Sequence, residues 1–79
     1  MNILLVDDDQ EVCALLKRYL ERELFRGQAV HNANDGLTEA LSGKYDAIIL
    51  DIMLPGGNGL EVLESIRQRS DIPVLMLTA

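Results

Sequence analysis

Acidic side chains follow two of the short apolar runs in this chain. Asp7–Asp9 come directly after the run at residues 3–6, and Asp51 comes directly after the run at residues 47–50. If the two runs form neighbouring strands, their carboxylates meet at one edge of a sheet. Crowded carboxylates repel one another and raise one another's pKa, so such a cluster is best tolerated when it holds a cation. Hard oxygen ligands of this kind suit Mg²⁺.

Asp51 is the member of this set that could act as a nucleophile. A carboxylate beside a divalent cation can attack a phosphoryl donor and form an aspartyl phosphate. Thr78 follows a third apolar run, at residues 74–77, and its hydroxyl could reach a phosphoryl oxygen. The simpler interpretation of an acid after a strand is a helix cap, which we favour for Asp9. Acids after two different strands, taken together, are what indicates a site.

The elements that would carry these residues alternate between strand and helix patterns. Continuous apolar runs are typical of strands that are buried on both faces. Apolar residues at helical spacing from Val12 to Leu24 indicate the first helix, which Asp8 or Asp9 would cap. We expect strands at 3–6, near 28–32, at 47–50 and at 74–77, a second helix from Asp35-Gly36 to Gly43, and a third after Asn58 to about Arg69.

The order β-α-β-α-β-α-β predicts an α/β fold with a parallel sheet, because parallel strands need helical crossovers. We expect helices on both faces and the flavodoxin-like strand order 2-1-3-4-5. In such sheets the reactive site lies beyond the carboxyl ends of the strands, where the aspartates are placed. The loop at residues 55–59 would lie at the same edge.

Composition and charge narrow the class of partner. The chain has 79 residues, 48% of them hydrophobic and 25% charged, with a net charge of −6. One small globular domain is expected, and the acidic balance argues against direct nucleic-acid binding. The run at 3–6 is too short to cross a membrane. Cys13 is the single cysteine, so we expect no intrachain disulfide, and we expect Cys13 to be a small residue of the core. A single thiol fits a reducing compartment, and we expect a cytoplasmic protein.

Three blocks of the sequence resemble signature blocks of the response-regulator receiver domain of two-component signalling. They are residues 4–9, 51–59 and 74–79, and the resemblance covers essentially the whole chain. Details such as Met53-Leu54-Pro55-Gly56 are most similar to the OmpR/PhoB subfamily of transcription regulators. The resemblance implies a CheY-like fold over residues 1–79 and a signalling module rather than an enzyme. Its partner would be a sensor histidine kinase.

The resemblance also implies roles for individual residues. Asp51 is similar to the family's phosphoacceptor, Asp8 to its direct Mg²⁺ ligand, and Asp7 to the acid that holds a metal-bound water. Met53 would offer its backbone carbonyl to the metal. Thr78 is similar to the switch hydroxyl that moves toward the phosphoryl group.

The loop after the third strand matches the family, whereas the lysines do not. Pro55 and Gly59 stand at the family's loop positions, and glycine there allows a tight backbone path. Neither Lys17 nor Lys44 matches the lysine that pairs with the phosphoryl oxygens in the family. The catalytic lysine is therefore missing from this chain, and we expect phosphorylation of Asp51 to be slow or absent.

The family's last strand and last two helices also have no counterpart here, so we expect an incomplete receiver domain, truncated after the fourth strand. A DNA-binding domain of the parent regulator would lie outside this chain. The fourth strand would then present a bare apolar edge, and such edges pair readily with other chains. Self-association as a dimer or by domain swapping is expected.

Two alternative functions differ in class from the phosphoacceptor. A phosphatase that starts from an aspartate after a buried strand would need a second aspartate two residues later, and Met53 stands there. This argues against an enzyme. The other alternative is a truncated receiver that is not phosphorylated and acts only as an association module.

Overall fold

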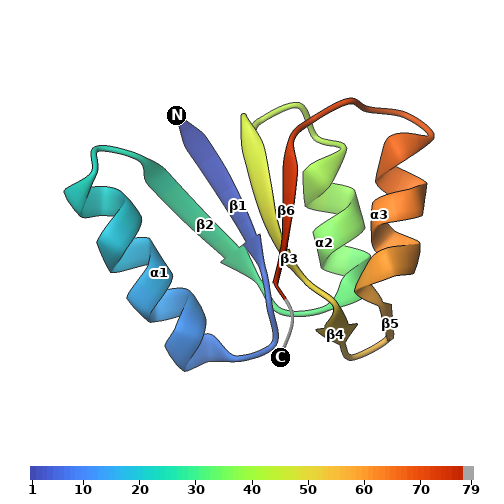
Figure 1. Cartoon of the computed structure of the whole chain (residues 1–79), viewed down its shortest axis with the longest axis horizontal. Coiled ribbons are helices and arrows are strands. Elements are labelled where there is room, and N and C mark those ends of the chain that lie inside the picture. The colour runs from blue at the N-terminus through green and yellow to red at the C-terminus, as the bar shows by residue number, and fades with distance from the viewer. Residues whose placement is uncertain (78–79) are drawn as a thin grey trace.

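The apolar runs form a parallel sheet with helices on both sides (Figure 1). The computed structural model describes residues 1–77. The elements are β1 (Asn2–Val6), α1 (Gln10–Arg22), β2 (Arg26–Val30), α2 (Ala33–Ala40), β3 (Ala47–Asp51), β4 (Met53–Leu54), β5 (Gly57–Asn58), α3 (Gly59–Arg67) and β6 (Val74–Leu77). The main sheet has the order β2-β1-β3-β6 with parallel pairs throughout. The predicted fold class and strand order are confirmed over the described residues.

β1 is buried on both faces, which explains its continuous apolar sequence. Successive side chains of a strand point to opposite faces of the sheet. Leu4 belongs to the core on the side of α2 and α3, together with Ile66, whereas Leu5 packs on the side of α1 with Cys13. Burial of one such leucine contributes roughly 1.5–3 kcal/mol. Cys13 is 2% exposed, so its predicted place in the core is confirmed.

Each helix begins with a polar side chain that accepts hydrogen bonds from backbone N–H groups. Asp9 caps α1 and accepts from two N–H groups of the first turn, at 3.0 and 3.1 Å. Asn58 caps α3 through the N–H of Leu60, at 2.8 Å. Of the two predicted caps for α1, Asp9 is therefore the correct one. The carboxylate of Asp8 is left for other contacts.

The second strand begins and ends earlier than predicted. β2 covers Arg26–Val30 rather than 28–32, because it pairs in register with the whole of β1. Asn32 therefore acts as the N-cap of α2, and its Oδ1 accepts from the N–H of Asp35 at 2.8 Å. As a result α2 begins at Ala33, before the predicted start at Asp35.

All three described helices end earlier than predicted. α1 ends at Arg22, and Leu24, which the helical spacing included, has a φ of +67° and lies in the turn after the helix. α2 ends at Ala40 rather than at Gly43, which has a φ of +80° and lies in the following turn. α3 ends at Arg67 rather than near Arg69. The guanidinium of Arg67 donates to the carbonyl of Ile72 at 2.6 Å, which draws the chain back toward β6.

The predicted loop after β3 contains a short hairpin. β4 and β5 pair antiparallel, with Leu54 opposite Gly57. Gly56 has a φ of +80°, a conformation that glycine adopts readily and that follows a proline in type II turns. Leu54 is buried and anchors the hairpin in the core. None of the helices described over residues 1–77 is long and apolar enough to cross a membrane.

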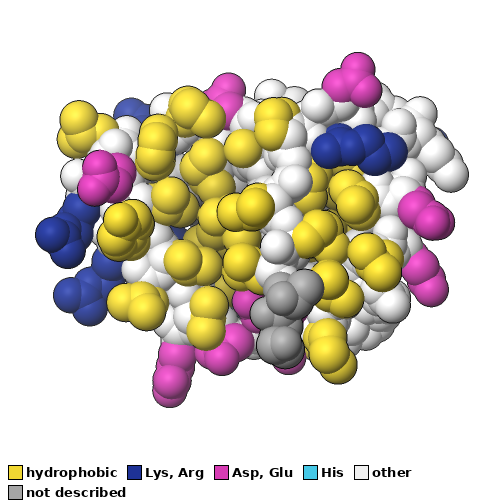
Figure 2. All heavy atoms as spheres, viewed as in Figure 1, with side chains coloured by type: hydrophobic (Ala, Val, Ile, Leu, Met, Phe, Trp, Pro, Cys, Tyr) yellow, Lys and Arg dark blue, Asp and Glu magenta, His cyan; other side chains and the backbone are white. Residues whose placement is uncertain are grey.

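α1 covers only part of its side of the sheet. It packs mainly on β2, and residues of β1, β3 and β6 line an apolar hollow of about 290 Å³ beside it. Leu75 of β6 is 63% exposed, and Leu15 and Tyr19 of α1 are 66% and 61% exposed, although their spacing predicts an inward face. Hydrophobic side chains accordingly gather across the middle of the visible surface, between α1 and the pair α2 and α3 (Figure 2).

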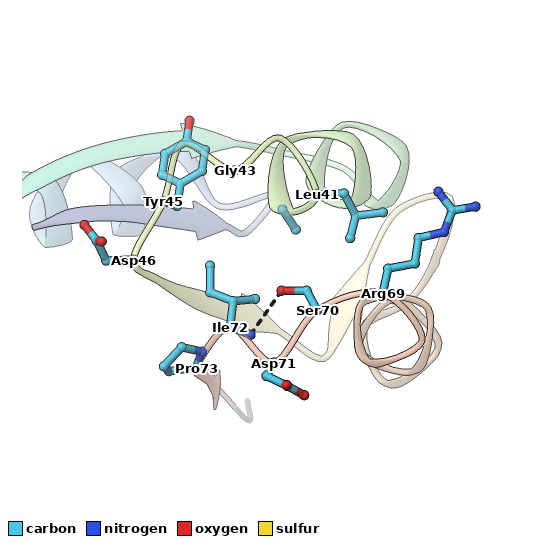
Figure 3. A pocket seen from close by; sticks show the side chains of 10 residues that line it. Leu41, Gly43, Tyr45, Asp46, Arg69, Ser70, Asp71, Ile72 and Pro73 are labelled. Atoms are coloured by element: carbon cyan, nitrogen blue, oxygen red, sulfur yellow. Dashed lines mark hydrogen bonds between the residues drawn. The ribbon is translucent and has the colours of Figure 1, made fainter.

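Another hollow, of about 530 Å³, lies at the amino ends of β3 and β6, opposite the carboxyl ends of the strands (Figure 3). Tyr45, Asp46, Arg69 and Asp71 are among its lining residues. The three charged side chains are exposed, and no polar residue of the lining is buried. This hollow is a surface feature and lacks the buried polar groups of a binding site.

Candidate functional site

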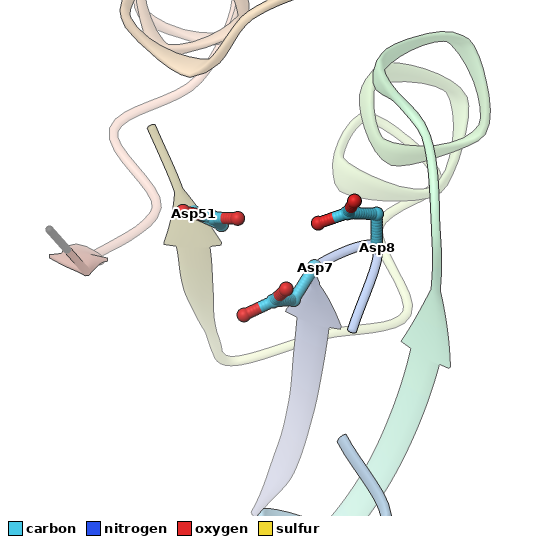
Figure 4. A group of neighbouring side chains, drawn as sticks. All are labelled: Asp7, Asp8 and Asp51. Carbon is cyan, nitrogen blue, oxygen red and sulfur yellow. The ribbon is translucent and has the colours of Figure 1, made fainter. Parts of the chain in front are cut away.

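The register of the sheet brings three of the predicted acids together. Val6 of β1 stands opposite Leu50 of β3, so the residues that follow them, Asp7 and Asp51, lie side by side at the carboxyl ends. Asp8 lies next to them. Each of the three residues offers one carboxylate oxygen, and these three oxygens all lie within 4.8 Å of one another. Figure 4 shows the three side chains turned toward a common space.

The three carboxylates differ in burial and in their hydrogen bonds. Asp7 is only 8% exposed, and its Oδ1 accepts from the N–H of Asp9 at 2.9 Å. Asp51 is half-buried, and its Oδ1 accepts from the N–H of Met53 at 3.2 Å. Asp8 is exposed. The inner carboxylates are therefore held by the backbone, whereas that of Asp8 reaches in from the solvent side.

The crowding of acids changes the ionisation of the most buried one. Burial is the main cause that raises the pKa of the Asp7 carboxyl above its ordinary value of 3.8, and the charges of Asp51, Asp8 and Asp9 raise this pKa further. The N–H of Asp9 opposes the shift but does not cancel it. A cation among the carboxylates would relieve the same repulsion.

The donor set fits a hard divalent cation. Asp7, Asp8 and Asp51 line a hollow at the carboxyl end of the sheet, together with Val12 and Leu77. These three carboxylates and that of Asp9, which also lines the hollow, are oxygen donors, as Mg²⁺ requires, and no lysine or arginine of residues 1–77 lines the hollow. The cluster therefore has both the ligand chemistry and the uncompensated negative charge of a Mg²⁺ site.

Gly59 and Pro55 shape the backbone next to Asp51. Gly59 begins α3, and its N–H donates to the carbonyl of Ile52 at 2.7 Å. A Cβ at this position would overlap the carbonyl oxygen of Asp51 and lie 2.6 Å from the Cα of Ile52. Glycine is therefore required for this close approach. The carbonyl of Pro55 accepts from the N–H of Ala33 at 3.3 Å, which ties the hairpin to α2.

Of the other predicted site residues, Met53 lies at the rim of the site and Thr78 lies outside the described residues. The side chain of Met53 is 68% exposed and lies at the rim of the acidic hollow. Its backbone N–H contacts Asp51, and the role of its carbonyl as a metal ligand stays a prediction. Thr78, the predicted switch hydroxyl, lies outside the described residues.

Two further side chains contact the site from behind, and the sequence patterns did not reveal this. The Nδ1 of His31 lies 2.9 Å from the backbone carbonyl oxygen of Asp7, and the Sγ of Cys13 lies 3.5 Å from the same oxygen. Burial raises the pKa of the Cys13 thiol, and the neighbouring aspartates raise it further, so the thiol keeps its proton. The side chain of His31 is half-buried.

Comparison with known proteins identifies the family. A family model described as the response regulator receiver domain matches residues 3–79. The chain belongs to this family. Receiver domains are signalling modules of two-component systems, so the predicted class of protein is confirmed. The cluster of Asp7, Asp8 and Asp51 lies within the matched part of this receiver domain.

Curated relatives show which proteins carry similar receiver domains. The chain is 42% identical over 78 residues to the transcriptional regulatory protein ResD of Bacillus subtilis, and 43% identical over 78 residues to the response regulator ArlR of Staphylococcus aureus. The match covers 99% of this chain but 32% of ResD and 36% of ArlR, about a third of their length. Both relatives are response regulators of the predicted OmpR/PhoB type.

Solved structures confirm the CheY-like receiver fold. The response regulator TrrA of Thermotoga maritima, solved in complex with Mg²⁺-BeF, matches with a TM-score of 0.91 and 39% identity, over 99% of this chain and 69% of that one. A structure of the histidine kinase ThkA in complex with TrrA contains a chain that matches with a TM-score of 0.91 and 40% identity, over 99% of this chain and 68% of that one.

Proposed function

We propose that this receiver domain accepts a phosphoryl group on Asp51 with Mg²⁺ as cofactor. The observation that carries the proposal is the meeting of three carboxylates, with oxygens within 4.8 Å of one another, at the carboxyl ends of β1 and β3. Asp8 and Asp51 would ligate the cation directly, Asp7 would hold one of its waters, and the backbone carbonyl of Met53 would complete the protein ligands. A relative of similar fold has been solved with Mg²⁺-BeF, which supports this cofactor.

In the proposed phosphoryl transfer, Asp51 acts as the nucleophile and other residues of the chain position the reacting groups. Oδ1 of Asp51 accepts a hydrogen bond from the N–H of Met53 at 3.2 Å, and Oδ2, which takes no part in this hydrogen bond, would attack phosphorus. A P–O bond to Asp51 forms as the P–N bond of a phosphorylated histidine breaks, and the electron pair of that bond goes to the imidazole, which takes a proton from water. Mg²⁺, when bound, neutralises charge on the transferred group. Thr78 would donate its hydroxyl to a phosphoryl oxygen.

A sensor histidine kinase is the proposed phosphoryl donor. The support is the structure of the kinase ThkA in complex with the response regulator TrrA, whose fold this receiver domain shares. The parent protein would be a transcription regulator, which is what the name of ResD says of that relative, and we propose that it binds DNA through another domain. The receiver domain itself has a net charge of −6 and would not bind nucleic acid directly. We place it in the cytoplasm, and we propose that it acts as a signalling module without enzymatic turnover of its own.

An association module that is not phosphorylated is the alternative function. The chain's lysines are Lys17 and Lys44. Lys17 lies in α1 with its stem against Gly27, and Lys44 precedes β3, at the opposite end of the strand from Asp51. Neither lines the acidic hollow. Without a lysine side chain at the acidic hollow, the receiver domain would not be phosphorylated. It would instead bind other copies through β6 and its open apolar face, by dimerisation or domain swapping.

Labelling with a small phosphoryl donor separates the two functions. The protein is incubated with acetyl phosphate and Mg²⁺, and intact mass and peptide mass spectrometry locate any phosphoryl group. Slow labelling on Asp51 that disappears in Asp51→Asn and without Mg²⁺ supports the phosphoacceptor. Labelling elsewhere contradicts it.

Cation binding is measured in parallel by calorimetry. Asp8→Ala should abolish most Mg²⁺ binding, whereas Asp46→Ala, an exposed acid at the other end of β3, should leave it unchanged. Normal Mg²⁺ binding without any labelling would favour the association module.

A further inference from the structure

The backbone of Asp7 is held from three directions. Its N–H donates to the carbonyl of Val30 at 3.1 Å. Its carbonyl oxygen faces the Nδ1 of His31 at 2.9 Å and the Sγ of Cys13 at 3.5 Å. No backbone N–H among residues 1–77 donates to this oxygen. Because β1 ends at Val6, the carbonyl of Asp7 lies beyond the regular ladder of the sheet, and side chains supply its partners.

The register of the sheet explains why residue 31 faces this carbonyl. β1 and β2 pair with Val6 opposite Val30, so the residues that follow them, Asp7 and His31, continue side by side. The ring of His31 is half-buried at this position. A backbone carbonyl can only accept, so the contact requires a proton on Nδ1 and leaves Nε2 without one in the neutral ring. The thiol of Cys13 is the weaker and more distant donor.

We propose that His31 is a positioning residue for the carboxylate cluster. The carbonyl of Asp7 and the N–H of Asp8 belong to one planar peptide unit, so a hydrogen bond to the carbonyl restrains the orientation of that whole unit. The unit lies between the Cα atoms of the two residues and helps to set the directions of their side chains. His31 thereby holds the carboxylates of Asp7 and Asp8 in the arrangement that a divalent cation requires.

This inference rests on the proposed Mg²⁺ site and adds a residue from outside it. His31 contacts no cation and contributes no ligand in this arrangement. Its effect is that of an outer partner which orients groups around a metal, and the loss of such partners typically lowers metal affinity about 10- to 100-fold. Because His31 contacts Asp7 through a backbone atom, the ligand side chains themselves are unchanged when residue 31 is substituted.

A pair of variants separates positioning from packing. In His31→Asn the side-chain amide nitrogen stands at the same distance along the chain as Nδ1 and can donate to the same carbonyl, whereas His31→Leu fills space without a donor. We expect His31→Leu to lower Mg²⁺ affinity about tenfold, measured by calorimetry, and His31→Asn to stay near the unaltered protein. Unchanged affinity in His31→Leu, or equal loss in both variants, would overturn the proposal. Circular dichroism without metal checks that both variants fold.

A measurement without metal tests the hydrogen bond itself. Long-range ¹H–¹⁵N correlation spectra at pH 8 distinguish the two neutral forms of the imidazole ring. We expect His31 to carry its proton on Nδ1, and a proton on Nε2 would refute the contact with Asp7. If the unaltered protein bound no Mg²⁺, the proposed function would fail, and this spectrum would still decide whether His31 holds the Asp7 carbonyl.

Discussion

Asp7 shows how burial and charge act on a single residue of the site. The residue is only 8% exposed, its carboxyl stands beside those of Asp51 and Asp8, and the pKa of this carboxyl is raised mainly because burial disfavours the charged form. A carboxylate in this position destabilises the folded protein unless a cation compensates it. Asp7 therefore destabilises the folded protein when no cation is bound, although the same residue would help to hold the cation.

The first prediction is that Asp7→Asn stabilises the protein in the absence of divalent cations. The unfolded chain ionises Asp7 near pH 3.8, while the folded protein resists ionisation until a higher pH. Stability is thus full below the unfolded pKa and is lost as pH rises from there through the raised folded pKa, so a penalty is present at neutral pH. We expect the variant to be more stable at pH 7 by on the order of 1 kcal/mol, and the difference to vanish near pH 3.

Thermal unfolding in EDTA from pH 3 to pH 7 measures this difference. Added Mg²⁺ should stabilise the unaltered protein more than the variant, because binding to the folded state alone raises stability. A lower melting temperature of Asp7→Asn at pH 7 in EDTA would contradict the prediction.

At the scale of elements, the N-terminal ends of α1 and α3 help to position the carboxylates of Asp7 and Asp51. Asp9 closes the first turn of α1 and also holds Asp7 through its N–H, at 2.9 Å. Gly59 lets α3 begin directly against the end of β3. Each of these two residues therefore serves both the helix that it begins and the carboxylate next to it.

The second prediction concerns the cap of α1. Asp9→Ala removes the acceptor for two N–H groups of the first turn. We expect a loss of about 1 kcal/mol in the free energy of unfolding, measured by urea denaturation. Asp9→Asn keeps a side-chain oxygen at the same place and should lose much less. Equal losses in the two variants would show that charge, not capping, is what matters at this position.

The third prediction concerns the approach of α3 to β3. Gly59→Ala places a methyl group against the carbonyl of Asp51 and the Cα of Ile52, which are backbone atoms that cannot rotate away. We expect a destabilisation of about 1–3 kcal/mol and weaker Mg²⁺ binding, because Asp51 must move. The matched control is Gly57→Ala, whose added Cβ would meet only the Cβ of Ala33, at 3.2 Å. An unaltered affinity for Mg²⁺ in Gly59→Ala would show that Asp51 does not shift.

For the whole molecule, the outstanding feature is the partly covered side of the sheet. Leu75 on β6 and Leu15 and Tyr19 on α1 are all more than half exposed, and the hollow beside them is apolar. β6 is also an edge strand of the described sheet. Exposed apolar edges favour association with another chain.

The fourth prediction is that Leu75→Lys reduces self-association. A charge on an edge strand disfavours pairing with a second copy, because it would have to lose its water. We expect sedimentation velocity to show concentration-dependent association of the unaltered protein and a smaller average mass for Leu75→Lys. The control is Leu60→Lys, which alters an exposed leucine on α3 and should behave as the unaltered protein. A monodisperse monomer before any substitution would refute the association.

The sequence alone predicts those features that depend on local order along the chain. Continuous apolar runs indicate buried strands, helical spacing indicates the intervening helices, and acids directly after the runs indicate the edge at which a site would form. Burial of Cys13 follows from the same local patterns. These predictions agree with the structure because periodicity and capping act over a few residues.

Only the tertiary structure decided which residues from distant segments meet. Parallel pairing of β2 with all of β1 moved the strand to Arg26–Val30, turned Asn32 into a helix cap and set His31 beside Asp7. The exposure of Tyr19 likewise depends on what covers the sheet, not on helical spacing. Register and coverage arise from contacts between elements, so no local pattern contains them. That is why the acids were predicted together, whereas the histidine behind them was not.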